Sequence, residues 1–506
     1  MKQYLTHIIF PIVILFFVSM SCTQIHYSTD PNDGISFSCD TLTFDTLFST
    51  IPSRTKSFLI YNNTNNYLLI SEIKLREGEN SSFRFNFNGK IPSDNNTLKN
   101  AEIMPHDSLY VFVEMTATEN NESTPIYIED ELLFSVNGNT TGVILNAYGQ
   151  NAVIFREHSL SCDTTLTAEH CYLIFDYLHI PEGQTLTITE GVTLYFHNEA
   201  HLIVDGNIRC EGTLEQPIVM RGDRFDYIAD VAHTPYDYMP GQWGNIYLQN
   251  NIGNYVFKYT HIRGGTLGMM LIGASRSKPL LTLENCVIHN MSGYGVYIQE
   301  GKANIANCEI SNCGISCLLQ LGGELTATHC TFANYYPWDI REAPAVLITN
   351  YILNGTRLSI FPIQNSTIEN SIIFGSKNEE LELQRDTFTN ALYNVYIADC
   401  LIKAKKSDDA YFHNIIWSHS QNDLIPGTSY YYTDTVFINT SINNIEETGY
   451  FNFQLDRNAK ACNTANYNVS SCYPIDLLGI NRLADGKPDM GAYEHTIKPQ
   501  TNSIYK

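Results

Sequence analysis

The chain has 506 residues, of which 43% are hydrophobic and 16% charged, a balance that suits a folded protein of two or three domains. Asp and Glu number 53 against 30 Lys and Arg, so the formal net charge at pH 7 is −23. This acidity argues against nucleic acid as a partner, because binding to phosphates depends on Lys and Arg. It also makes a polyanionic glycan an awkward partner unless a cation intervenes.

The first residues have the pattern of an export signal. Lys2 is followed by an apolar run from Ile8 to Val18, which is too short to cross a hydrocarbon core of about 30 Å as a helix. The run ends in Ser-Met-Ser-Cys at 19–22, which resembles a bacterial lipobox. The resemblance implies a signal peptide at 1–21 and acylation of Cys22, which would hold the protein on a membrane through its lipid chains.

The resemblance to a lipoprotein also implies a location. We expect the cell envelope, in the outer membrane of a Gram-negative bacterium, with residues 22–27 as a tether. The alternative is an ordinary secretory signal in which the cysteine is incidental.

Residues 28–151 are predicted to form a β-sandwich. Short runs rich in β-branched and aromatic residues are separated by clusters of Asn, Gly, Ser and Pro. In the run 109–113, Leu-Tyr-Val-Phe-Val, one alternating set should face a core and the other should face outward. The segments 56–73, 103–113 and 143–149 are similar to an immunoglobulin-like domain of the abnormal-spindle/hydin type. That resemblance implies a spacer or an interaction module.

A 22-residue repeat predicts the fold of the following part of the chain. Cys286, Cys308 and Cys330 follow one another at steps of 22, and apolar residues recur around them in the same register. Each unit is therefore one coil whose inward side chains are buried only when coils stack, at about 4.8 Å from one another. These cysteines, with Cys400, are predicted to be stacked core residues, since a free cysteine behaves as a small buried hydrophobe. We predict a parallel β-helix over residues 152–460.

Asparagine precedes the cysteine column in several coils, at Asn285, Asn307 and Asn370. Apolar positions on the two sides of it are three apart, which breaks the alternation of a strand. Asparagine tolerates the left-handed backbone conformation that a sharp bend needs. The repeat therefore predicts a bend at this position of each coil.

Three segments resemble right-handed β-helix proteins. Residues 183–223 and 240–248 are similar to the entry turns and the tryptophan-containing strand of secreted members. Residues 475–495, which include Asp-Met-Gly-Ala-Tyr-Glu, are similar to the terminator of β-helix lipoproteins. These resemblances imply a right-handed, single-stranded, pectin-lyase-like helix, so the whole chain is expected to be all-β.

The last segment, 461–506, is expected to cap the solenoid, because an open coil presents unpaired backbone to other chains. The sandwich and the first short coils are expected to close the other end. Asp489 and Glu494 should then hold the terminal loop, and a catalytic role for them is the less favoured interpretation.

Of the 13 cysteines, two pairs are close in sequence. Cys162 with Cys171, and Cys462 with Cys472, are predicted to form local disulfides, which export would permit. Three other cysteines lie close together, at Cys308, Cys313 and Cys317. Their spacing is not the paired spacing of a zinc site, so no metal is expected there.

Parallel β-helices host several polysaccharide-active enzymes, but a fold alone does not establish an activity. Glycoside hydrolysis needs two carboxylates in defined places. The chain has Asp408-Asp409, yet it lacks the other motifs of polygalacturonases, and its Arg-Ser-Lys at 276–278 precedes the acidic pair. Hydrolysis of that type is not expected.

The insertion at 223–237 carries the densest group of carboxylates, Asp223, Asp226, Asp230 and Asp237. Oxygen ligands of this kind suit calcium. These residues are a possible calcium or substrate site, of the kind that calcium-assisted lyases use. A similar acidic and tyrosine-rich loop also occurs in relatives that do not look like enzymes.

Aromatic residues concentrate in two other insertions. Tyr335, Tyr336 and Trp338 are a possible sugar-stacking group, and Tyr430 to Tyr432 form a second run. Rings with an apolar face and a polar edge suit the surface of a sugar. The alternative is that these rings fold the insertion onto the wall of the helix.

The sequence thus predicts a cell-envelope lipoprotein that presents a β-helix for binding, either to a glycan or to an envelope protein. No recognisable catalytic constellation is present, and calcium is the one cofactor suggested. A polysaccharide-active enzyme of the calcium-assisted lyase type and a purely structural surface protein are the alternatives.

Overall fold

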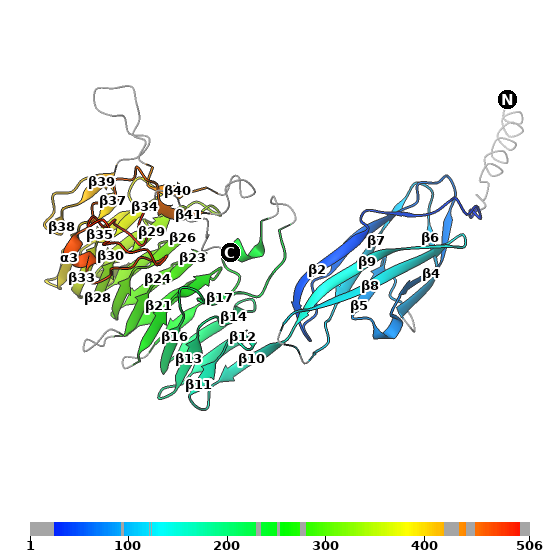
Figure 1. Cartoon of the computed structure of the whole chain (residues 1–506), viewed down its shortest axis with the longest axis horizontal. Coiled ribbons are helices and arrows are strands. Elements are labelled where there is room, and N and C mark those ends of the chain that lie inside the picture. The colour runs from blue at the N-terminus through cyan, green and yellow to red at the C-terminus, as the bar shows by residue number, and fades with distance from the viewer. Residues whose placement is uncertain are drawn as a thin grey trace, which may run out of the picture. The chain divides into compact units, whose positions relative to one another are not determined.

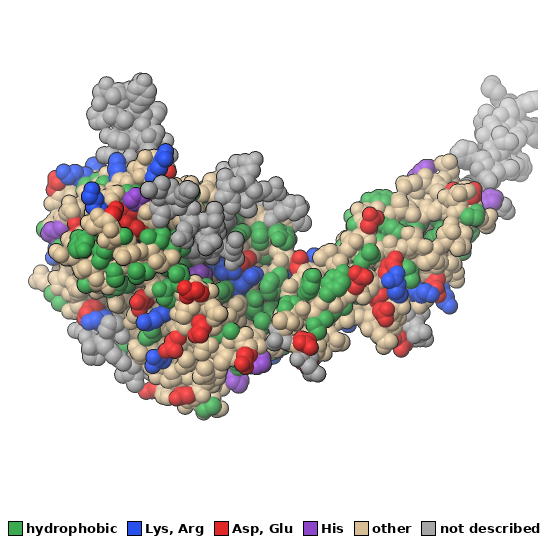
Figure 2. Space-filling model, viewed as in Figure 1, with side chains coloured by type: hydrophobic (Ala, Val, Ile, Leu, Met, Phe, Trp, Pro, Cys, Tyr) green, Lys and Arg blue, Asp and Glu red, His purple; other side chains and the backbone are tan. Residues whose placement is uncertain are grey.

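The computed structural model describes residues 25–92, 96–120, 122, 124–228, 234–249, 253–273, 280–418, 435–441 and 451–495. The predicted signal peptide, Cys22, Asp230 and Tyr430 to Tyr432 lie outside these residues. The chain divides into two compact units, Met1–Asn151 and Ala152–Lys506. Among the described residues, no helix has the length and apolar character needed to cross a bilayer. Figure 1 shows the strands of both units, and Figure 2 shows acidic side chains scattered over the visible face of each.

The first unit is a β-sandwich of two sheets (Figure 1). One sheet has the order β1 (Ser36–Phe37), β3 (Lys56–Tyr61), β7 (Ser108–Met115), β5 (Phe83–Phe87). The other has the order β2 (Thr41–Phe48), β9 (Asn139–Gln150), β8 (Ile126–Val136), β4 (Leu68–Leu75), β6 (Thr97–Ile103). Neighbouring strands are antiparallel, except that β2 pairs with β9 in parallel.

Strand β7 has the alternation that its sequence predicted. Val111 and Val113 are fully buried between the sheets, whereas Tyr110 and Phe112 face outward and stack on each other with ring centroids 5.7 Å apart. The inward set joins a core made by both sheets. The likeness to one particular immunoglobulin-like family remains a prediction.

The second unit is a parallel β-helix built of three ladders of strands, here called A, B and C. Ladder A contains β10 (Ala152–Ser159), β12 (Cys171–Ile180), β14 (Thr193–Phe196), β17 (Ile218–Gly222), β20 (Thr260–Arg263), β23 (Val287–Met291), β26 (Glu309–Cys313), β29 (Thr331–Asn334), β34 (Ile372–Gly375), β37 (Leu401–Lys403) and β39 (Ile416–Ser418). Ladder B contains the end of β12 and then β15 (His201–Val204), β18 (Ile246–Leu248), β21 (Met269–Ile272), β24 (Val296–Gln299), β27 (Leu318–Leu321), β30 (Val346–Thr349) and β35 (Leu381–Gln384). Ladder C contains β11 (Thr164–Leu166), β13 (Thr185–Thr189), β16 (Asn207–Glu211), β19 (Tyr255–Lys258), β22 (Leu281–Glu284), β25 (Lys302–Ala306), β28 (Gly323–Thr328), β33 (Ile363–Glu369), β36 (Tyr393–Ala398) and β38 (Phe412–His413). One strand of each ladder, in the order C, A, B, makes one coil.

The cysteine column lies where the repeat predicted it, between ladders C and A. The flanking residues pair in register from coil to coil, and the backbone N–H of Cys286 donates to Cys308 Sγ at 3.4 Å. Cys286, Cys308, Cys330 and Cys400 are all fully buried in the continuous core of the solenoid. The predicted stacking of one coil on the next is confirmed.

The predicted bends are confirmed as well. The residue that precedes the column has a left-handed backbone in successive coils, with φ of 55° at Asn285, 56° at Asn307, 51° at His329, 49° at Asn370 and 51° at Asp399. The side chains form a ladder of their own, in which Asn307 Nδ2 donates to Asn285 Oδ1 at 2.5 Å. Asparagine and aspartate adopt this conformation more readily than other residues with a side chain.

The C-terminal segment does not lie where the sequence predicted it. Residues 461–495 were expected to close the end of the solenoid, but they run along its side through α3 (Tyr467–Ser470), over ladder A and the bends that precede it. The strands β40 (Phe437–Asn439) and β41 (Asn452–Leu455), predicted as part of the β-helix, form a separate two-stranded sheet that belongs to the same covering layer, and the name C-terminal segment is used for all of residues 435–495. The cause is the burial of apolar surface. Ladder A has outward apolar side chains that this segment covers, at Val287, Ala333, Ile372 and Leu401. Full burial of each of the larger side chains in this set contributes roughly 1.5–3 kcal/mol to the stability of the fold.

The two predicted disulfides are not formed, since Cys162, Cys171, Cys462 and Cys472 are free thiols in the structure. Cys162 precedes the first strand of ladder C, whereas Cys171 begins β12 in ladder A. Cys472 is exposed after α3, and Cys462 lies among side chains from the end of the chain. Closeness in sequence therefore did not bring either pair together.

Candidate functional site

The insertion at 223–242 connects β17 to β18, and one of its carboxylates, that of Asp237, contacts side chains of ladder A. Arg221 and Arg263 point outward from neighbouring strands, and Asp237 lies between them, 3.0 Å from Arg221 Nε and 2.8 Å from Arg263 Nη2. Burial alone would raise the pKa of Asp237, but the two guanidinium groups hold it below its ordinary value. Asp237 therefore fastens the insertion to the wall.

The other described carboxylates of the insertion also have cationic or imidazole partners. Asp226 pairs with Arg224, and Asp223 Oδ2 lies 2.7 Å from His197 Nδ1. Among the described residues these carboxylates do not come together as one group of metal ligands. Arginines pair with two of these carboxylates, at Asp226 and Asp237.

Tyr335, the first ring of the predicted sugar-stacking group, has a packing role. It stacks on Phe453 with ring centroids 5.9 Å apart and meets the ring of Phe437 edge-on at 6.3 Å. Burial raises the pKa of its hydroxyl well above the ordinary value. This is the alternative interpretation of these rings, in which they hold an insertion against the wall.

A cavity of about 520 Å³ adjoins Tyr335 and is lined by Phe374, Ser376, Lys403 and residues 435–441. Lys403 Nζ donates to the carbonyl oxygen of Gly375 at 2.7 Å and lies 5.3 Å from the centre of the Phe374 ring. Burial lowers the pKa of this lysine. The ammonium group is thus already used in holding the wall together.

A more extensive surface lies on ladder B. Its outward column is hydrophobic in successive coils, and we call it the ladder B stripe: Ile203, Tyr247, Met270, Tyr297, Leu319 and Leu347. All of these side chains are partly exposed except Leu319, which is 7% exposed. The inward neighbours in the same strands, such as Ile246 and Ile298, are fully buried. The stripe is therefore an apolar surface in addition to the core.

The other two ladders differ from ladder B. The corresponding outward column of ladder C is mostly polar: Thr187, Arg209, Val256, Thr282, Asn304, Thr326 and Thr367. From β23 to β37, the outward apolar residues Val287, Ala333, Ile372 and Leu401 of ladder A are buried under the C-terminal segment. Ladder B thus combines apolar character with partial exposure. Extended patches of this kind mark binding surfaces.

Further aromatic rings contact two side chains of the stripe. Tyr294, in the bend before β24, meets Tyr297 edge-on with ring centroids 5.5 Å apart, and His201 lies 5.4 Å from Tyr247. Burial raises the pKa of both Tyr294 and Tyr297, so their hydroxyl groups stay neutral near pH 7. Each ring offers an apolar face and a hydroxyl group that can donate or accept a hydrogen bond.

Tyr336 and Trp338 lie in the connection between β29 of ladder A and β30 of ladder B. Both are partly exposed, and Tyr336 lies against Gly314 of the preceding coil, where an added Cβ atom would come 3.3 Å from its Cζ atom. Burial raises the pKa of the Tyr336 hydroxyl to about 12. Of the predicted sugar-stacking group, these two residues keep part of their surface exposed.

The sequence of ladder B carries a repeated signal for the stripe. Strands 246–248, 269–271, 296–298 and 346–348 read Ile-Tyr-Leu, Met-Met-Leu, Val-Tyr-Ile and Val-Leu-Ile. A strand that is buried on one face should alternate apolar and polar residues. Three apolar residues in a row, repeated once per coil, indicate a second apolar face.

Comparison with known families agrees with this architecture. Residues 245–444 match the family model of the right handed beta helix region. No curated protein matches the chain. The wall described here is thus a right-handed parallel β-helix, and the strands extend the fold to the N-terminal side of the matched region, as far as β10.

Proposed function

We propose that the protein is a cell-envelope lipoprotein whose β-helix binds an extended, neutral glycan along the ladder B stripe. The observation that carries this proposal is the register of the stripe. Parallel pairing aligns one apolar or aromatic side chain per coil from Ile203 to Leu347, and nearly all of them keep exposed surface.

A polymer suits this surface because the binding groups repeat. Successive coils place equivalent side chains about 4.8 Å apart along the solenoid. Tyr247 and Tyr297 are two coils apart, with Met270 between them, so rings and a flexible thioether alternate in one line. Pyranose rings have apolar faces and hydroxyl edges, which match rings that carry a polar tip.

Charge favours a neutral glycan over an acidic one. The chain carries a formal net charge of −23, which repels polyanions at long range. Arg221 and Arg263, which point outward from ladder A beside the insertion, are already paired with Asp237. The membrane tether rests on the lipobox resemblance at Cys22, which supports a place in the outer membrane.

Retention on a panel of insoluble and gel-immobilised polysaccharides, neutral and acidic, tests the proposal. The protein without residues 1–22 should be held by at least one neutral polysaccharide, with and without calcium. Fragments should be analysed in the same samples. New unsaturated ends would instead point to a lyase, and loss of retention on chelation would point to the carboxylates of the insertion.

Failure to bind any glycan, combined with capture of an envelope protein by the intact surface, would overturn the glycan proposal and favour a protein partner.

A further inference from the structure

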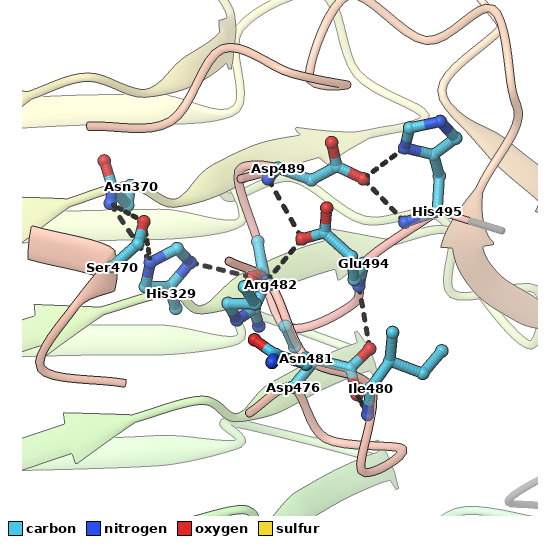
Figure 3. Close-up of polar contacts among 12 residues, drawn as sticks. His329, Asn370, Ser470, Asp476, Ile480, Asn481, Arg482, Asp489, Glu494 and His495 are labelled. Atoms are coloured by element: carbon cyan, nitrogen blue, oxygen red, sulfur yellow. Dashed lines mark hydrogen bonds and ion pairs between the residues drawn. The ribbon is translucent and has the colours of Figure 1, made fainter. Parts of the chain in front are cut away.

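A second group of side chains, remote from the stripe in the sequence, lies at the end of the C-terminal segment. Cys462 follows β41 and α3 follows it, while Asp489 and His495 belong to the last described stretch. One thiol sulfur, one carboxylate oxygen and one imidazole nitrogen from these residues all lie within 4.8 Å of one another. Figure 3 shows the carboxylate of Asp489 directed toward His495.

The backbone holds these three donors in place. The N–H of Met490 donates to the carbonyl oxygen of Ala461 at 3.1 Å, which joins the two stretches directly beside Cys462 and Asp489. The N–H of Asn463 donates to Asp489 Oδ1 at 2.6 Å, and the N–H of His495 donates to Asp489 Oδ2 at 2.6 Å. The cluster is therefore part of an ordered framework.

The three donors together suit a transition metal of intermediate softness. Thiolate, imidazole and carboxylate are the ligands of zinc, at about 2.0–2.3 Å from the ion, so neighbouring ligand atoms lie about 3.3–3.8 Å apart. His495 Nδ1 and Asp489 Oδ2 are 2.7 Å apart. Zinc binding would therefore require the His495 and Asp489 side chains to move slightly apart.

The local charge also favours a cation. Asp489 is fully buried, and the carboxylate of Glu494 accepts a hydrogen bond of 3.1 Å from the Asp489 N–H. The cation nearest to these carboxylates among the described ion pairs is Arg482, whose Nη1 lies 3.6 Å from Glu494 Oε2. A divalent ion would give the buried carboxylate of Asp489 a cationic partner, and the His495 side chain keeps 22% of its surface exposed.

A cysteine, a histidine and an aspartate could also form a nucleophilic triad, but the surroundings of the thiol argue against this. Burial, followed by the charges of Asp489 and Glu494, raises the pKa of Cys462 to about 12. A nucleophilic cysteine needs the opposite shift, toward the thiolate. A bound cation, by contrast, stabilises the thiolate directly.

We propose that a divalent metal ion of the zinc class binds to Cys462, Asp489 and His495. The ion would join the stretch after β41 to the last described stretch of the chain and so stabilise the layer that covers ladder A. The site is structural, because its ligands come from two stretches that the ion would clamp together. It is independent of the glycan surface proposed above.

Titration of the metal-free protein with Co²⁺ and Zn²⁺ tests the proposal. Cobalt should produce a sulfur-to-metal charge-transfer band together with the visible bands of low coordination number, and zinc should displace it at a 1:1 ratio. Cys462→Ser should remove the charge-transfer band, and His495→Gln should weaken binding of both metals at least tenfold. Cys472→Ser, which changes an exposed thiol ten residues away, should leave both signals intact.

Absence of the charge-transfer band in the unaltered protein would overturn the proposal. So would loss of the band in Cys472→Ser or its persistence in Cys462→Ser. Should Cys462→Ser fail to fold, as judged by circular dichroism, His495→Gln decides the matter, because its ring lies at the end of the described chain and keeps 22% of its side-chain surface exposed.

Discussion

Arg482 Nη2 donates a hydrogen bond of 2.6 Å to Asn307 Oδ1, although the two residues are 175 positions apart in the chain. Asn307 has the left-handed backbone of a bend, and Arg482 belongs to the terminator-like segment. Bends of the solenoid also bind other parts of the C-terminal segment: Asn307 Nδ2 donates to the carbonyl oxygen of Ile475 at 3.0 Å, and Asn370 Nδ2 donates to that of Asn466 at 3.0 Å. The bends of the solenoid thus provide the docking groups for the C-terminal segment.

Replacing Arg482 with Ala should destabilise the β-helix unit by about 3–5 kcal/mol, because a fully buried cation would be removed from the side of Asp476 and Glu494. Urea-induced unfolding followed by circular dichroism measures the change in the midpoint. The matched control is Arg357→Ala, at the exposed hairpin turn between β31 (Tyr351–Asn354) and β32 (Arg357–Ile360). It should lower the free energy of unfolding by less than about 0.5 kcal/mol, as is usual for a surface substitution. Equal effects of the two variants would contradict the buried ion-pair account.

Two substitutions at Asn307 should distinguish the contribution of its left-handed backbone from the contribution of its hydrogen bonds. Asn307→Ala loses the hydrogen bonds and also places a β-carbon at φ 56° without the compensation that asparagine provides. Asn307→Gly loses the same hydrogen bonds but tolerates the backbone, so it should be less destabilised than Asn307→Ala by about 1 kcal/mol. Unfolding curves of the two variants measure this difference, and the reverse order would show that the left-handed bend is not strained by alanine.

The stability of the β-helix unit should fall on acidification. Burial, and then the charge of Arg263, lowers the pKa of His289 to about 3, while Asp237 opposes this shift and His261 adds to it. Between about pH 6.5 and pH 3 the unfolded chain binds a proton at this residue and the folded chain does not, so folding loses about 1.4 kcal/mol per pH unit. The loss is absent above pH 6.5.

The pH dependence of the urea midpoint checks this expectation. His289→Asn should flatten the slope between pH 6 and pH 4, within the range set above, whereas His413→Asn, which changes an exposed ring of ladder C, should keep it. An unchanged slope in His289→Asn would assign the acid sensitivity to other buried groups, such as His329, whose pKa is also lowered by burial.

The parts of the fold that repeat were predictable from the sequence. The cysteine column and the asparagine bends could be placed because each coil encodes its own register, and one coil buries the next. The path of the C-terminal segment could not be placed in this way. It depends on single contacts over long separations, such as the one between Arg482 and Asn307, and these leave no periodic trace.

The candidate sites show the same division. Asp223, Asp226 and Asp237 are close in sequence and suggested a cation site, but Arg263 reaches Asp237 from a neighbouring coil, 26 residues away. The ladder B stripe was visible in principle, since its strands contain apolar triplets. The triplets alone do not predict an exposed stripe, because a run of apolar residues also fits a strand that is buried on both faces.

The most direct test of the proposed function is the dissociation constant of the glycan found on the panel for the double variant Tyr247→Ala, Tyr297→Ala. Removing two stacking rings should weaken binding about tenfold or more, which corresponds to about 1.4 kcal/mol or more. Tyr396→Ala, which removes an outward, 41% exposed ring from ladder C, should bind as the unaltered protein does. An unchanged dissociation constant in the double variant, or an equal loss in Tyr396→Ala, would contradict a binding surface on ladder B.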